Sequence, residues 1–94
     1  MAYAIARVRI KDLDRFLEVF GTRGAAKRAE YNCRGVQVHQ SSEDPQALIN
    51  VFDWDRADVE AFMADPEVAE IMAAVGLEGP PEFTFVERIA EFES

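Results

Sequence analysis

The segment that most constrains the fold is ALINVFDWD, from Ala47 to Asp55, because it is apolar on both faces of a predicted strand. Side chains alternate along a strand and divide this segment into two sets. One set is Leu48, Asn50, Phe52 and Trp54, and the other is Ala47, Ile49, Val51 and Asp53. Because both sets are mostly apolar, we expect the central strand of a small antiparallel sheet. The chain's own helices should cover one face of that sheet, and something else should cover the other.

The remaining elements predict a single domain over residues 1–94. Alternating patterns predict three further strands, at Tyr3–Ile10, Val36–Ser41 and Glu82–Ala90. A first helix is capped by Asp12 or Asp14, is interrupted between Gly21 and Gly24, and resumes through Tyr31. A second begins at Asp55, restarts at Asp65-Pro66-Glu67 and ends at Gly76. The order βαββαβ predicts an α+β, ferredoxin-like sandwich with a four-stranded antiparallel sheet, its first and third strands central and its helices on one face.

Charge and composition exclude several functional classes. The net charge of −8 disfavours nucleic-acid binding. Eight of the ten basic residues lie among the first 34 residues, a polarity that would steer subunits or an anionic ligand, or merely marks a solvated helix face. No apolar run is long enough to cross a membrane, and the single Cys33 excludes an internal disulfide. We therefore expect a cytoplasmic protein without membrane or nucleic-acid partners.

The second apolar face of the sheet predicts a homodimer. Ile49 and Val51 lie on the opposite face of the central strand from Phe52 and Trp54, so exposing either face to water is unfavourable. A two-fold pair hides such a face with one self-complementary surface. Arg7 and Arg9 share one face of the first strand, and we expect Glu87 of the last strand to supply a carboxylate partner in the dimer core; an anion-binding pair of arginines is the alternative.

The element order, the doubly apolar strand and the runs VFDWD and FMADPEVAEIMAAVGLEGPPEF resemble a known group. This group is the dimeric α+β barrel proteins related to antibiotic-biosynthesis monooxygenases, in particular their small uncharacterised members. The resemblance implies a two-fold dimer with one cavity per subunit, between sheet and helices. Its relatives include cofactor-independent oxygenases, haem-degrading oxygenases, lactone isomerases and proteins without known activity. The fold therefore predicts a site but not a reaction.

The resemblance and the strand pattern together select two candidate catalytic residues, His39 and Asn50. Trp54 matches the family's cavity-lining Trp and offers one N–H donor. Asn50 lies on the same face as Trp54, where its amide is either tied to the backbone or directed at a ligand. His39 is the only histidine, and it shares this face only if the register of the hairpin allows it; otherwise it is a surface or dimer-interface residue.

The predicted substrate-binding residues are apolar or aromatic, and each would alternatively serve only as core. They are Trp54, Phe52, Tyr3, Phe16, Phe20, Phe62 and Met72. No cofactor and no metal are expected, because one His and one Cys do not make a zinc site. The haem-degrading relatives carry an axial His on the second helix, and Arg56 to Val75 contains none.

Two functions remain open from the sequence. The first is a homodimeric small-molecule-binding protein that, if catalytic, acts as a cofactor-independent monooxygenase, cyclase or isomerase on an aromatic or enolisable substrate. The alternative is a non-enzymatic dimeric ligand-binding or stress-related module, in which the same residues are core. Whether the protein is an enzyme is left open.

Overall fold

The computed structural model describes residues 2–94 and contains four strands and four helices in that range. The strands are β1 (Ala2–Arg9), β2 (Gly35–Gln40), β3 (Ala47–Asp53) and β4 (Glu82–Glu87). The helices are α1 (Leu13–Gly21), α2 (Arg23–Glu30), α3 (Arg56–Met63) and α4 (Pro66–Val75). Each predicted helix is thus two consecutive pieces. No helix in residues 2–94 is long and apolar enough to cross a membrane.

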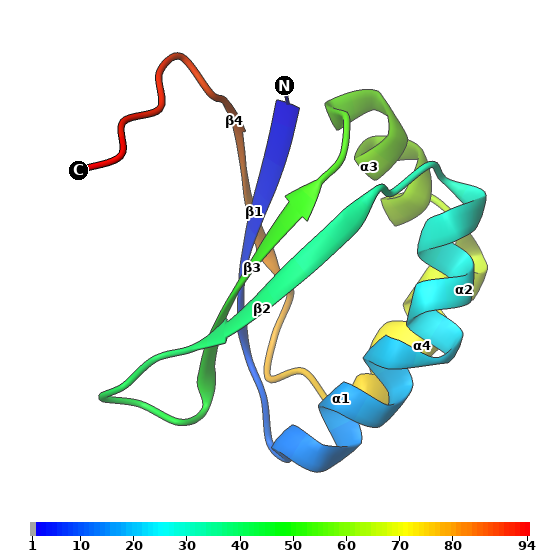
Figure 1. Ribbon diagram of the computed structural model, residues 1–94. Coiled ribbons are helices and arrows are strands. Elements are labelled where there is room, and N and C mark those ends of the chain that lie inside the picture. Colours follow the sequence, from blue (N-terminus) through cyan, green and yellow to red (C-terminus); the bar gives the residue numbers. More distant parts are fainter. Residues whose placement is uncertain (1) are drawn as a thin grey trace.

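The strands form one antiparallel sheet in the order β2-β3-β1-β4, with β1 and β3 in the centre. All four helices pack on the same face of this sheet, and the opposite face is left uncovered (Figure 1). The predicted ferredoxin-like α+β sandwich is confirmed. The register pairs Ala6 with Asn50 and Asn50 with Val38 across three strands, so these residues share the helix-covered face.

Local signals explain where the helices begin and end. The Asp12 carboxylate caps α1 by accepting from Arg15 N at 3.2 Å. The predicted break occurs at Thr22, between α1 and α2. Asp65 caps α4 at Glu67 N, 2.9 Å away, and Gly76 ends α4 with a left-handed φ of 74°. The α1 and α4 helices so bounded contact each other.

One predicted cap has a different role. Asp55 occupies the N-cap position of α3, but its side chain makes no capping hydrogen bond. Its carboxylate instead pairs with Arg34 Nη2 at 3.2 Å, and Arg34 also contacts Asp53 at 2.9 Å. This ion pair fixes the turn from α2 into β2 against the end of β3.

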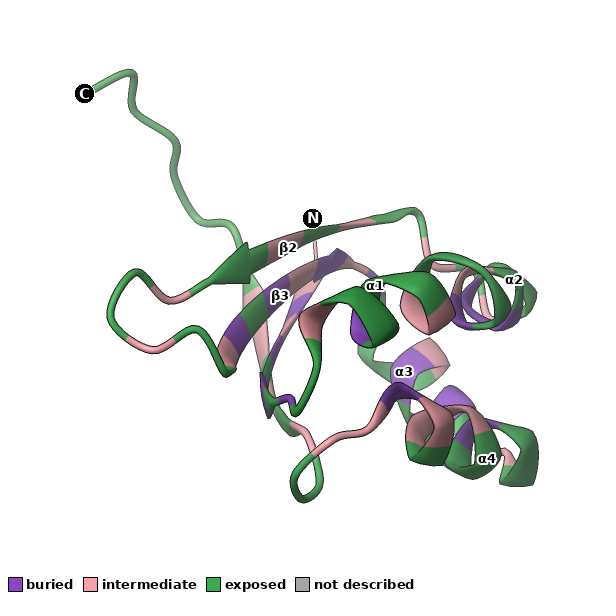
Figure 2. Cartoon of the chain, turned by 90° about the horizontal axis from the view of Figure 1, so that it is seen from below, coloured by how far each residue is buried: buried purple, intermediate pink, exposed green. Residues whose placement is uncertain are grey.

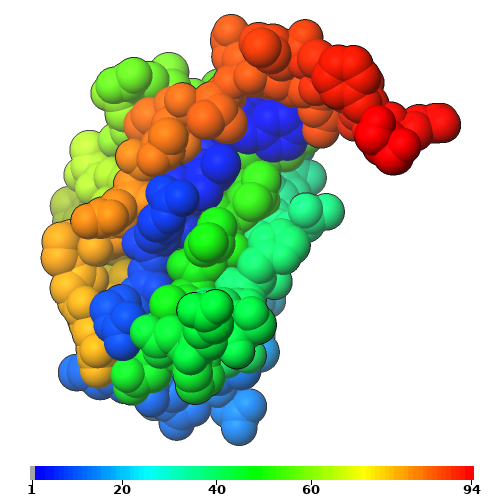
Figure 3. Space-filling model, turned by 90° about the vertical axis from the view of Figure 1, so that its left-hand side faces the viewer, coloured from blue at the N-terminus to red at the C-terminus, as the bar shows by residue number. Residues whose placement is uncertain are grey.

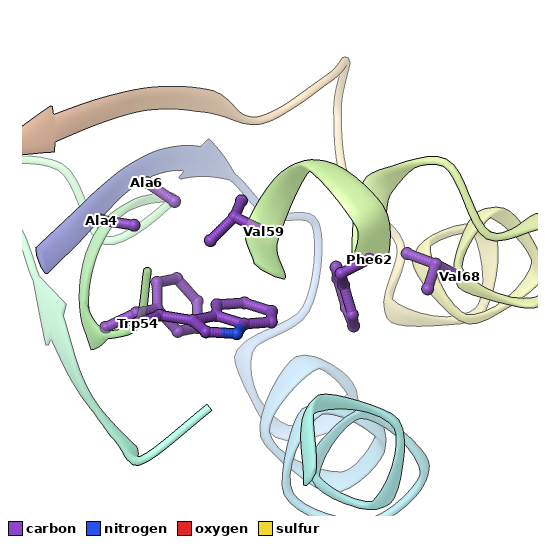
Figure 4. Packing of buried hydrophobic residues seen from close by; sticks show 7 residues of the cluster. Ala4, Ala6, Trp54, Val59, Phe62 and Val68 are labelled. Carbon is purple, nitrogen blue, oxygen red and sulfur yellow. The ribbon is translucent and has the colours of Figure 1, made fainter. Parts of the chain in front are cut away.

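The core lies between the sheet and the helices (Figure 2). Trp54, which is 1% exposed, packs between the strand that carries Ala4 and the helix that carries Phe62 (Figure 4). The Trp54 and Phe62 rings meet edge to face with centroids 4.9 Å apart. A second buried group surrounds Phe16 and Leu48 beneath α1. Every buried side chain of β3 therefore belongs to the first of its two predicted sets.

The other face of the sheet is solvent-exposed in the single chain (Figure 3). Its centre is apolar, with Ile5, Val51 and Val86 half-buried and Ile49 39% exposed. The predicted Arg7–Glu87 pair is wrong, because the register sets Arg7 opposite Glu82 and leaves it exposed. Glu87 instead lies opposite Ala2, near the far end of β1.

The last strand is shorter than predicted, since β4 ends at Glu87 and residues 88–94 have no regular structure. This tail leaves the sheet beside the start of β1 and extends away from the domain (Figure 1). Arg88 anchors its base by donating to Tyr3 Oη at 2.8 Å. Beyond it, Ile89 and Phe92 are 97% and 83% exposed, so neither contributes to the core of the single chain.

Candidate functional site

A cavity of about 70 Å³ lies between the sheet and the helices. Its floor comes from β1, β3 and β4, and its walls come from all four helices and from residues that follow α4. Of the residues that line it, only Asn50 and Arg28 carry a polar side chain, apart from the indole of Trp54. The cavity is about half the size of the ~150 Å³ apolar cavity that accommodates benzene. It therefore holds a small group as it stands, and a ring only if side chains move.

Asn50 reaches this cavity from the middle of β3. Its side chain is 2% exposed, and Oδ1 is a buried acceptor without any hydrogen-bond partner among residues 2–94. Such an acceptor loses its hydration on folding and gains nothing in return, which costs about 1–3 kcal/mol. The sequence left two roles open for the Asn50 amide, a hydrogen bond to the backbone and a hydrogen bond to a ligand. Oδ1 does not make the hydrogen bond to the backbone. Because Oδ1 is buried, a ligand reaches this acceptor only after neighbouring side chains move.

Trp54 forms part of the wall, as expected, but its donor is already used. The indole Nε1 donates to the carbonyl of Tyr31 at 2.7 Å. This bond ties the end of β3 to the end of α2, and it leaves the indole ring rather than its N–H group facing the cavity. The expectation that Trp54 offers a hydrogen bond to a ligand is therefore wrong.

The predicted aromatic and apolar residues gather around the cavity, with one exception. The lining includes Phe16, Phe20, Phe52, Phe62, Met72 and Trp54. Tyr3 is the exception: it pairs with Asp53 and Val86 on the uncovered face of the sheet, and its hydroxyl contacts Arg88. Its predicted place in the same pocket is therefore wrong.

The hairpin register separates the two predicted catalytic residues. His39 pairs with Ile49, whereas Asn50 pairs with Val38. Directly opposed residues share a face and successive residues do not, so His39 lies on the uncovered face, where it is exposed. The predicted grouping of His39 with Asn50 and Trp54 is corrected accordingly.

The charged group of the cavity is Arg28, which sequence reasoning did not select. Its side chain is 8% exposed, and its guanidinium carbon lies 3.9 Å from the centroid of the Phe20 ring. Nη1 donates to the Phe20 carbonyl at 3.0 Å. Burial lowers the pKa of Arg28. A usable sequence signal was Gly24, one helical turn earlier, which leaves room for this side chain.

A network of charged groups holds the helices around the cavity. Lys27 Nζ contacts Asp65 at 2.9 Å and Glu67 at 2.8 Å, and Tyr31 Oη donates to Asp65 at 2.7 Å. These bonds, first that of Tyr31 and then that of Lys27, lower the pKa of Asp65 to about 2. The pKa of Lys27 is raised, through its hydrogen bonds to Glu67 and Asp65. The network fastens α2 to the start of α4.

The described residues 2–94 form neither a metal site nor an activated cysteine nucleophile. Within the described chain, no three His, Cys, Asp or Glu residues are placed to hold a metal ion. Cys33 is half-buried, and burial raises the pKa of its thiol, so it stays protonated near neutral pH. The chemistry available at the cavity is therefore that of an apolar wall, one amide acceptor and one guanidinium.

Comparison with known proteins identifies the family. Residues 1–74 match the family of antibiotic biosynthesis monooxygenases. The chain belongs to this family. The match includes β1 to β3, α1 to α3 and nearly all of α4, and hence both Asn50 and Trp54. No curated protein matches the sequence.

Solved structures of this family and its neighbours share the fold. The cofactor-independent oxygenase SnoaB from Streptomyces nogalater, solved as an asparagine-to-alanine mutant, matches with a TM-score of 0.73 and 14% identity over 99% of this chain and 97% of its own. An uncharacterised NIPSNAP domain protein from Burkholderia xenovorans matches with a TM-score of 0.70 and 21% identity over all of both chains. A Bordetella bronchiseptica protein described as an antibiotic biosynthesis monooxygenase has a TM-score of 0.67 and 23% identity, over 95% and 97% of the two chains. At these identities the likeness concerns the fold.

Proposed function

We propose that this protein binds a small aromatic or enolisable molecule in the cavity beside Asn50 and Trp54. It acts on that molecule as a cofactor-independent monooxygenase, cyclase or isomerase. Membership of the monooxygenase family supports the class of reaction, and SnoaB is a cofactor-independent oxygenase with the same fold. Phe16, Phe20, Phe52, Phe62 and Met72 then contact the substrate.

The observation that carries this proposal is the unpaired Oδ1 of Asn50. A neutral amide does not remove protons at neutral pH, so Asn50 accepts a hydrogen bond from a phenol, an enol or an N–H group and orients the substrate. The indole face of Trp54 then sets the plane of the bound ring. Because His39 lies on the other face of the sheet, proton transfer in this cavity involves the substrate's own groups or water rather than a histidine.

The functional unit in this proposal is a homodimer joined through the uncovered sheet face. Ile5, Ile49, Val51 and Val86 form the apolar centre of that face. An antiparallel sheet normally carries polar residues on a solvated face, so this pattern favours a second copy stacked sheet against sheet. His39 lies on the same face of the sheet, so in this dimer it faces the partner subunit and not the substrate. We propose that the dimer is cytoplasmic.

A non-enzymatic binding or stress-related module is the second candidate, and two observations favour it. The Trp54 N–H group is occupied by the Tyr31 carbonyl, and the cavity of about 70 Å³ is far smaller than the roughly 300–1,000 Å³ typical of ligand pockets. In that case Asn50 binds a small ligand without any turnover. The two candidates share the site and differ only in whether the bound molecule changes.

Native mass spectrometry of the freshly purified protein tests the shared claim, with Asn50→Leu as the matched variant. A dimer that carries extra mass, which the variant lacks, supports a ligand at Asn50. Incubation of the released compound with the wild type in air then separates the candidates, because only an enzyme converts it. A monomer at micromolar concentration refutes the dimer, and extra mass retained by the variant refutes the site.

A further inference from the structure

Arg28 holds a buried positive charge at the wall of the cavity. It projects from α2, and contact with the Phe20 ring on α1 and with the Phe20 carbonyl fixes the guanidinium. That carbonyl belongs to the last turn of α1, where the negative end of the helix dipole offsets part of the charge. The Phe20 carbonyl takes one of the five N–H groups that an arginine offers, and the Cys33 side chain is a second hydrogen-bond partner.

No carboxylate neutralises this charge. None of the ion pairs found among residues 2–94 includes Arg28, although Lys27, its neighbour in sequence, contacts three acidic groups. The Cys33 thiol is close by, but it stays neutral because burial raises its pKa. An arginine remains protonated even where burial disfavours its charge. Buried cations are normally paired with an anion, and no acidic side chain among residues 2–94 forms an ion pair with Arg28.

The backbone of α2 makes room for the guanidinium at one position. A Cβ atom at Gly24 would lie 3.1 Å from Arg28 Nη1 and 3.3 Å from the carbonyl oxygen of Val19. Contacts this short would displace the guanidinium by a few tenths of an ångström. The φ angle of Gly24 is not positive, so the turn itself does not require a glycine. The absence of a side chain at Gly24 therefore serves the position of Arg28.

Two polar side chains, Asn50 and Arg28, border the otherwise apolar cavity, and both are almost completely covered. Asn50 Oδ1 lacks a donor, and Arg28 lacks an anion. We propose that the ligand is a small organic anion, whose carboxylate or enolate oxygen binds Arg28 while an O–H or N–H group donates to Asn50. This inference rests on the proposed function and names its substrate class. The cavity volume of about 70 Å³ restricts the ligand to a single ring, for which the flexible side chain of Met72 must yield.

For an enolisable ligand, the same contact has a chemical consequence. Loss of a proton from carbon places negative charge on an oxygen, and a fixed guanidinium in a site shielded from water stabilises that charge. Arg28 then favours the enolate over the neutral ligand, and the proton leaves to water or to another oxygen of the substrate. A neutral ligand of the same shape gains nothing from Arg28.

The test compares 4-hydroxybenzoate with 4-hydroxybenzamide, which have nearly the same shape but differ in charge at pH 7. We expect isothermal titration calorimetry to show at least tenfold tighter binding of the benzoate. Arg28→Met should reduce its affinity to about that of the amide, and circular dichroism and thermal unfolding check that the variant is folded. Arg28→Lys should keep a preference for the anion. Gly24→Ala, which crowds Nη1 without removing any charge, should weaken benzoate binding severalfold.

Each contrary result has a distinct meaning. Equal affinity of the wild type for both compounds refutes the anion preference and leaves the proposed binding site standing. Arg28→Met that lowers the melting temperature but keeps the preference shows that Arg28 only caps α1. If neither compound binds to the wild type, both this inference and the proposed binding of single-ring phenols are wrong.

Discussion

Replacing Asn50 by Leu should stabilise the fold while it abolishes ligand binding. The buried Oδ1 has no partner, and such an unsatisfied acceptor costs about 1–3 kcal/mol. Leu removes this cost, and its larger side chain extends into the adjacent cavity of about 70 Å³. The backbone pairing of β3 with β1 and β2 is unchanged. The free energy of unfolding should therefore increase by about 1–3 kcal/mol, and each kcal/mol raises the melting temperature of a domain this size by about 4–8 °C.

Urea and thermal unfolding at one fixed protomer concentration measure this difference, because any dimer makes stability depend on concentration. Leu48→Ala is the matched control, since Leu48 lies two residues away on the same face and is 1% exposed. It should lose about 2–5 kcal/mol, as truncation of a packed core side chain does. If Asn50→Leu is instead destabilised by more than about 1 kcal/mol, Asn50 makes a structural hydrogen bond and the assignment of Oδ1 to a ligand is wrong.

Three further predictions concern the scaffold. Asp65→Asn should be less stable than the wild type at neutral pH, because the lowered pKa of Asp65 stabilises the fold only while its carboxyl is ionised. Urea titrations should show that the difference in unfolding free energy shrinks as the pH falls from 3.8 towards 2. An undiminished difference at pH 2 would contradict this. Gly76→Ala should cost about 1–2 kcal/mol in thermal melts, since φ is +74°, whereas Gly21→Ala, with open space and no positive φ, should be nearly neutral. Val51→Glu should shift the proposed dimer to monomer in sedimentation velocity, because it buries an unpaired carboxylate in the apolar interface, and a dimer unchanged in affinity would show that this face is not the interface.

The central strand and its buried face could be predicted from the pattern of Ala47 to Asp55. The alternation assigned Leu48, Asn50, Phe52 and Trp54 to one face, and these four are the buried residues of that segment. Short signals such as Asp65-Pro66 and Gly76 then placed the boundaries of α4. Such features are local, so they are readable without knowledge of the rest of the chain.

The parts of the site that could not be predicted depend on contacts between distant residues. The face of His39 depends on the hairpin register, because a shift of one residue moves a side chain to the other side of the sheet. The loss of the Trp54 donor depends on where α2 ends, which brings the Tyr31 carbonyl within 2.7 Å. Arg28 lies in a helix rich in charged residues, where a solvated position is the ordinary expectation, and only the packing of α2 on α1 buries it.

The most direct test of the account is a ¹H–¹⁵N NMR titration of the labelled protein with 4-hydroxybenzoate, assigned through the side-chain amide of Asn50. We predict that this amide and the backbone of the cavity residues Val68 and Met72 show the largest shift changes, because the ligand lies between Asn50 and Arg28. Shift changes confined to the uncovered face, around His39 and Arg7, would contradict the account and place ligand binding on the other side of the sheet.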